Sequence, residues 1–193
     1  MDGSRASAIE VTILAKGWDT MRIQGLLRRL EAFPHAFATL VQGLGAEDYR
    51  FKPPSGAWSI LEIARHLLDE DAEDFPARLR FILEGREGAW PSIDPEGWAR
   101  ERKYNEADLH DTLAKFTQRR AEHLRWLRSL PAETDWAKAY AHPKFGPIRA
   151  GDLLAAWAAH DALHLRQAAK RLYELAGEDG RPFSTAYAGA WGP

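Results

Sequence analysis

Residues 156–167 read AWAAHDALHLRQ, and we expect them to lie in a long helix from about residue 151 to residue 176. Gly177 provides the C-terminal stop for this helix. His160 and His164 are four residues apart, so they share one helix face. Apolar residues fall on the same arc, which predicts that the two imidazoles point into the protein.

Two further helical units are predicted from apolar spacing alone. The first spans residues 21–32 and 35–44, and Pro34 is expected to end or kink it because proline has no N–H and clashes with the preceding turn. The other runs from about residue 106 to residue 130, where Pro131 closes it.

The clearest helix start in the chain lies at Ser59. Ser59 and Glu62 fit a capping box, in which the hydroxyl accepts a backbone N–H and the carboxylate reaches back to the N-cap. We expect this helix to continue to about Glu84, with a bend near Pro76.

These units predict an all-α protein, a four-helix bundle with short additions. The expected organisation is an N-terminal arm at residues 1–18, a bundle domain at 19–177 and a C-terminal tail at 178–193. A short irregular insertion at residues 133–149 precedes the last helix.

Composition excludes several classes of protein. The 26 basic and 28 acidic residues give a formal net charge of −2, which argues against a nucleic-acid surface. The chain has no cysteine, so disulfides, thiolate metal sites and cysteine nucleophiles are excluded. No apolar run approaches the ~20 residues of a membrane helix, and the expected location is the cytoplasm.

The chemistry of the chain centres on the histidine pair. Two neutral imidazoles on one helix face can converge on a divalent cation such as zinc or nickel, but they can equally be hydrogen-bonded core residues. His66 is the best third ligand, with Glu70 one turn further on. The main apolar stripe of its helix points elsewhere, so His66 requires a second buried face.

The remaining histidines are expected to lie outside this cluster, and one segment resembles a different metal motif. His35, His110 and His123 are expected to be structural, and His142 could line the rim of a site. The segment 160–164 reads HDALH, similar to the H-E-x-x-H of zinc proteases, but aspartate has a shorter reach. Asp161 is better suited to support a site from behind, or to hydrogen-bond a neighbouring helix.

A set of motifs in fixed order resembles the DinB-like superfamily, close to its YfiT-type branch. The resemblance covers roughly residues 22–176 and rests on Trp58-Ser59-Ile60 with His66-Leu67, then on His142-Pro143 with Phe145-Gly146, then on Trp157, His160-Asp161, His164 and Gln167. It implies an up-down-down-up four-helix bundle and a divalent metal held by His66, His160 and His164. The serine or threonine usual at the start of the last helix is absent here.

The resemblance also implies an activity. Family members include metal-dependent hydrolases and transferases or isomerases that use low-molecular-weight thiols. In such a site the metal, zinc or nickel, activates a water or a thiol of a small-molecule partner, and Glu70 or Asp161 could accept the proton. A homodimer is also implied. The alternative is a non-catalytic metal-binding bundle with a structural or stress-response role. DNA binding is opposed by the balanced charge.

Overall fold

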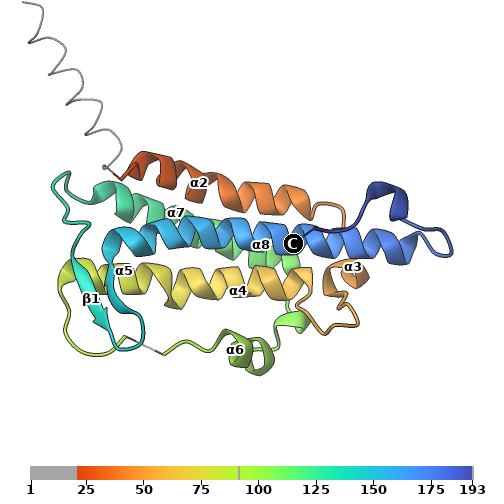
Figure 1. Ribbon diagram of the computed structural model, residues 1–193, viewed down its shortest axis with the longest axis horizontal. Coiled ribbons are helices and arrows are strands. Elements are labelled where there is room, and N and C mark those ends of the chain that lie inside the picture. Colours follow the sequence, from red (N-terminus) through yellow and green to blue (C-terminus); the bar gives the residue numbers. More distant parts are fainter. Residues whose placement is uncertain (1–20, 91, 193) are drawn as a thin grey trace, which may run out of the picture.

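The computed structural model describes residues 21–90 and 92–192 as a helical bundle (Figure 1). The predicted N-terminal arm, residues 1–18, lies outside the described residues. The bundle is built from α2 (Ile23–Leu40), α4 (Ile60–Glu73) continued by α5 (Phe75–Glu84), α7 (Leu109–Ser129) and α8 (Ala150–Asp179). The predicted four-helix bundle is therefore confirmed.

The four helical units run up, down, down and up along the bundle (Figure 1). α4 with α5 and then α7 point in the same direction, so residues 85–108 must cross back along the length of the bundle between them. This crossover carries the short helix α6 (Pro95–Glu101), at the edge of the bundle beside α4 (Figure 1), and the 3₁₀ turn η1 (Tyr104–Glu106), which also packs against α4. α8 packs against α2, α4 and α5, which places the two predicted histidine-bearing helices side by side.

The predicted division of the first helix at Pro34, into residues 21–32 and 35–44, is wrong. α2 is a single helix of 18 residues with Pro34 inside it. Proline removes one hydrogen bond from a helix, but Phe33 and Phe37 on either side are buried in the core and hold both halves in place. Tertiary packing therefore outweighs the local breaking signal.

The second unit begins as the sequence predicts and bends close to the expected point. The Ser59 hydroxyl accepts the Glu62 N–H at 3.1 Å, and a Glu62 carboxylate oxygen accepts the Ser59 N–H at 2.8 Å. Asp74 interrupts the helix, and Pro76 lies in the first turn of α5, where its missing N–H leaves no partner unsatisfied.

The segment before α8 differs from the expected irregular insertion. It contains a two-stranded antiparallel hairpin, β1 (Ala139–His142) and β2 (Gly146–Arg149), with Tyr140 opposite Ile148. Gly146 has a positive φ of 74°, which suits the turn between the strands. α8 also continues through Gly177 instead of stopping there.

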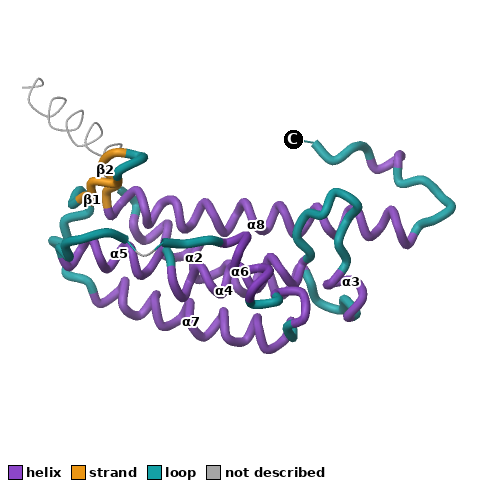
Figure 2. The backbone as a smooth tube through the Cα atoms, turned by 90° about the horizontal axis from the view of Figure 1, so that it is seen from below, coloured by secondary structure: helices purple, strands orange, loops and turns teal. Residues whose placement is uncertain are grey.

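Four short helical elements were not predicted from the sequence: α6 and η1 of the crossover, and two others. α3 (Ala46–Arg50) follows α2, and the 3₁₀ turn η2 (Ala186–Ala188) lies in the C-terminal tail, which folds back beside α8 (Figure 2). The Tyr173 hydroxyl donates a hydrogen bond to the Gly189 carbonyl at 2.9 Å, so the tail is anchored to the end of α8.

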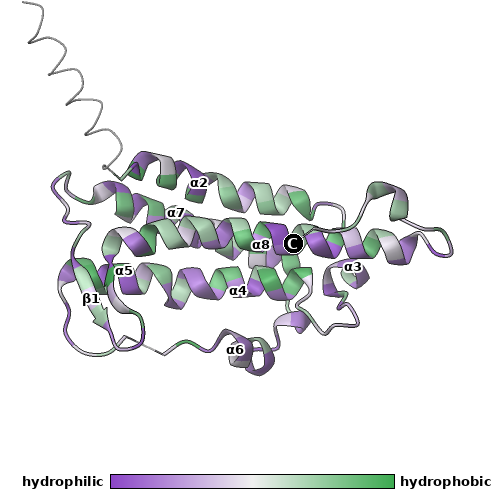
Figure 3. Ribbon diagram, viewed as in Figure 1, coloured by the Kyte–Doolittle hydropathy of each residue, from purple (hydrophilic) through white to green (hydrophobic). Residues whose placement is uncertain are grey.

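The core consists of two apolar clusters, one toward each end of the bundle. Each helix alternates hydrophobic and hydrophilic patches along its length, as amphipathic helices do (Figure 3). α4 is exceptional because residues on all its faces are buried, including His66, Asp69, Glu70 and Asp71. This supplies the second buried face that the sequence analysis required for His66.

Among the described residues, no helix has both the length and the apolar composition needed to cross a membrane.

Removing the cap at Ser59 should destabilise the bundle. The hydroxyl is fully buried, caps α4 and donates a hydrogen bond to the Asn105 side chain at 2.6 Å. We expect Ser59→Ala to lower the free energy of unfolding by about 1–3 kcal/mol, measured by urea denaturation. The exposed Ser55→Ala is the control and should lie within about 0.5 kcal/mol of the parent. Equal effects from both variants would contradict this prediction.

Candidate metal centre

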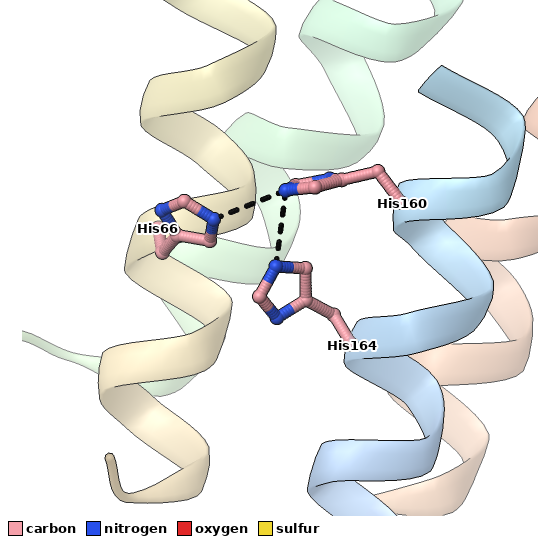
Figure 4. Close-up of side chains that lie close together, drawn as sticks. All are labelled: His66, His160 and His164. Carbon is pink, nitrogen blue, oxygen red and sulfur yellow. Dashed lines mark hydrogen bonds between the residues drawn. The ribbon is translucent and has the colours of Figure 1, made fainter. Parts of the chain in front are cut away.

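Three imidazoles meet between α4 and α8 (Figure 4). His66 comes from α4, and His160 and His164 come from consecutive turns of α8. The Nε2 atom of His160 lies 3.2 Å from Nε2 of His66 and 3.0 Å from Nε2 of His164. The predicted histidine pair and the predicted third histidine therefore lie together, and each ring contributes its Nε2 atom.

These separations fit a metal ion. Four ligands at 2.0–2.1 Å around a tetrahedral zinc are about 3.3 Å from one another, which is close to the two Nε2 distances. The three histidines form a group whose ligand atoms all lie within 4.8 Å of one another. Three protein nitrogens leave at least one position open on a tetrahedral ion, the arrangement of catalytic zinc sites.

Burial keeps the imidazoles neutral. Burial, together with the nearby His164 and His160, lowers the pKa of His66 to about 2. Burial, His164 and the charge of Arg120 lower the pKa of His160 to about 3, and burial also lowers the pKa of His164. Neutral rings offer lone pairs to a cation without competition from protons near neutral pH.

The nitrogens that face away from the centre are held differently on the two helices. Nδ1 of His164 donates to the Gln167 side-chain oxygen at 2.8 Å, which leaves the lone pair on Nε2. Nδ1 of His66 is buried without a hydrogen-bond partner, and Oε1 of Glu70 lies 3.7 Å from it. An ion on Nε2 fixes the proton on Nδ1, where Glu70 is the nearest acceptor.

Glu70 therefore lies behind His66 and not beside the convergent nitrogens. Burial, together with a hydrogen bond to Asp74 and the charge of Asp74, raises its pKa to about 9 against the opposing charge of Arg78. Such a carboxyl is protonated at neutral pH. The expectation that Glu70 accepts a proton during catalysis stays a prediction.

Asp161 is occupied elsewhere. Both of its carboxylate oxygens accept hydrogen bonds from Arg120 of α7, at 2.6 and 3.0 Å. This is the contact to a neighbouring helix that the sequence analysis considered for Asp161. A role for Asp161 as a proton acceptor at the metal also stays a prediction.

Two aromatic rings flank the imidazoles. The centroid of the Trp58 ring, just before α4, lies 4.9 Å from the centroid of the His66 ring. The ring of Phe75, at the start of α5, lies 5.0 Å from that of His160. The i,i+3 spacing of Gln167 from His164 is the sequence signal for its hydrogen bond to that ring, whereas no local pattern places Phe75 beside His160.

The other histidines lie outside the centre. Nε2 of His123 is 2.8 Å from the backbone carbonyl of Asp71. His142 is on β1, where its ring contacts Trp90 and Phe145. His35 and His110 are exposed.

The chain belongs to the DinB superfamily, whose family model matches residues 29–168. The match includes all three histidines of the centre.

Two proteins to which the chain is similar are described as candidate metal-dependent hydrolases. A curated protein of Oceanobacillus iheyensis, named as a candidate metal-dependent hydrolase, is 26% identical over 142 residues, which is 72% of this chain and 79% of the relative. The solved structure of YfiT from Bacillus subtilis, described as a probable metal-dependent hydrolase with an unusual four-helix bundle topology, superposes with a TM-score of 0.71. It shares 17% identity and covers 80% of this chain and 87% of its own, so it supports the fold.

Metal binding should depend on the convergent histidines. We expect one divalent ion per chain, and His164→Ala should weaken zinc or nickel binding by more than the roughly 10–100-fold typical of a lost outer partner. Competition against a chromophoric chelator measures the affinity. The exposed His110→Ala is the control and should bind as the parent does. Unchanged affinity in His164→Ala would exclude His164 as a ligand.

The metal-free protein should lose stability in acid through these rings. Because the pKa of His66 falls from 6.5 to about 2 on folding, the unfolded chain binds a proton that the native state does not between those values. Stability therefore falls as pH drops below 6.5. From pH 6.5 to 5.0, His66 should account for a loss of about 2 kcal/mol.

Urea denaturation of chelator-treated protein at both pH values checks this. His66→Gln should show a smaller loss than the parent over the same interval, and the exposed His110→Gln should match the parent. An equal loss in His66→Gln would show that His66 titrates normally in the folded protein.

Proposed function

We propose that the protein is a metal-dependent hydrolase whose centre is formed by His66, His160 and His164. The observation that carries this proposal is the convergence of three Nε2 atoms at distances that suit one tetrahedral ion. The names of the relatives from O. iheyensis and B. subtilis support the reaction class.

The donor set determines the chemistry. A divalent ion held here, zinc or nickel, would lower the pKa of a bound water toward ~7, or would convert a bound thiol to its thiolate. Neutral imidazoles add no negative charge, so they leave the full charge of the cation to act at its open position. The three rings themselves bind and do not react.

The surrounding side chains orient and shield the centre. Gln167 fixes the tautomer of His164, and the Glu70 carboxyl faces Nδ1 of His66 at 3.7 Å. Trp58 and Phe75 border the imidazoles with apolar ring surface. Such walls limit water around the reacting group and favour a small-molecule substrate with an apolar portion.

The same centre could act on a low-molecular-weight thiol, so the experiment must separate two reactions. Protein loaded with zinc or nickel is tested with activated esters and amides, with and without a small thiol. We expect hydrolysis that needs no thiol, is abolished by a chelator and returns when metal is restored. His164→Ala should be inactive, and His110→Ala should match the parent.

Other outcomes point elsewhere. Turnover that occurs only with a thiol would replace the hydrolase by a thiol transferase. Tight metal binding with no turnover of any substrate in either condition would favour the non-catalytic metal-binding bundle.

A further inference from the structure

One buried arginine contacts all four helical units of the bundle. Arg120 of α7 is 1% exposed and lies in the centre of the protein. Its Nε and Nη2 atoms donate to Asp71 of α4 at 2.8 and 2.9 Å, and its Nη1 and Nη2 atoms donate to Asp161 of α8 at 2.6 and 3.0 Å. Nη1 also donates to the Leu30 carbonyl of α2 at 3.0 Å.

These five contacts match the five N–H donors of a guanidinium. Both aspartates bind in a bidentate manner, which fixes direction as well as distance. The Trp157 indole N–H donates to Asp71 at 3.0 Å. The guanidinium carbon of Arg120 lies over the rings of Trp157 and Phe116, 5.0 and 4.9 Å from their centroids. The arrangement is therefore rigid as well as buried.

The two aspartates belong to the helices that carry the candidate ligands. Asp161 directly follows His160 in α8, and Asp71 lies on α4 five positions after His66. Where α4 and α8 meet at the centre, the facing groups are imidazole nitrogens 3.2 and 3.0 Å apart, and without a cation neutral rings can share only N–H···N hydrogen bonds there. The charged, bidentate pairs of Arg120 are the stronger interaction between the same two helices, so they are suited to hold them at ligand distance.

We propose that Arg120 is a positioning residue for the metal centre: by binding Asp71 and Asp161 with one guanidinium, it sets the separation of α4 and α8 at which three histidines can share an ion. This inference rests on the proposed metal binding by the histidines. It assigns to Asp161 a role in holding His160 in place through its own helix.

Arg120→Lys tests this inference because it keeps the charge but removes the planar fork, and lysine cannot bind both carboxylates in a bidentate manner. The measurement is titration of the metal-free protein with Co²⁺, followed by the visible absorption of the bound ion and by chelator competition. We expect at least a tenfold weaker affinity and a changed absorption spectrum, as for the loss of an outer partner of a metal ligand.

A general loss of stability must be separated from a loss of positioning. Leu127→Ala is the matched control, since Leu127 is a buried core residue of the same helix. Urea denaturation ranks the stability of each variant, and Co²⁺ binding is measured where all are folded. Leu127→Ala should keep the parent spectrum and an affinity within twofold.

Three results would overturn the inference. Parent-like affinity and spectrum in folded Arg120→Lys would show that the arginine does not position the ligands, with metal binding itself intact. Equal weakening in Leu127→Ala would assign the effect to stability alone. Absence of Co²⁺ binding in the parent would remove both this inference and the proposed function.

Should Arg120→Lys fail to fold, Asp161→Asn takes its place, because asparagine preserves the shape and leaves the Arg120–Asp71 pair in position. It should weaken Co²⁺ binding at least fivefold and change the spectrum. A parent-like Asp161→Asn would overturn the inference in the same way.

Discussion

The burial of a single positive charge at Arg120 constrains the whole bundle. A guanidinium removed from water is tolerated only when each of its donors is paired, and here the partners come from α2, α4 and α8. Breaking such a buried pair typically costs about 3–5 kcal/mol because a charge is left without compensation. The relative placement of the helices is thus set by hydrogen-bond direction, a stricter condition than apolar contact.

This constraint explains how the protein tolerates so many polar groups along α4. Asp69, Glu70 and Asp71 are consecutive and buried, and they face different groups. Asp69 accepts hydrogen bonds from Tyr104 and Arg102, which ties the crossover segment to α4. Asp71 faces Arg120, and Glu70 remains beside His66. The three neighbouring carboxyls therefore face different parts of the protein: Asp69 the crossover, Asp71 the buried arginine and Glu70 the candidate metal centre.

The sequence predicted what depends on local periodicity and spacing, and it failed where distant groups decide. The capping box at Ser59, the inward pair at His160 and His164 and the four helical units all follow from patterns within a few turns. Pro34 misled because its flanking phenylalanines are held by the core. Arg120 lies in a polar stretch that looks solvent-exposed, and its partners are 49 and 41 residues away, so no local pattern could reveal it.

The long stretch of sequence between His66 and the other two histidines couples metal binding to folding. His66 and His160 are 94 residues apart, so an unfolded chain could offer a cation little more than the adjacent pair, since closing so long a loop is entropically unfavourable. An ion that prefers the native state shifts the folding equilibrium toward it in proportion to its supply. The amount of folded protein would then rise and fall with metal availability.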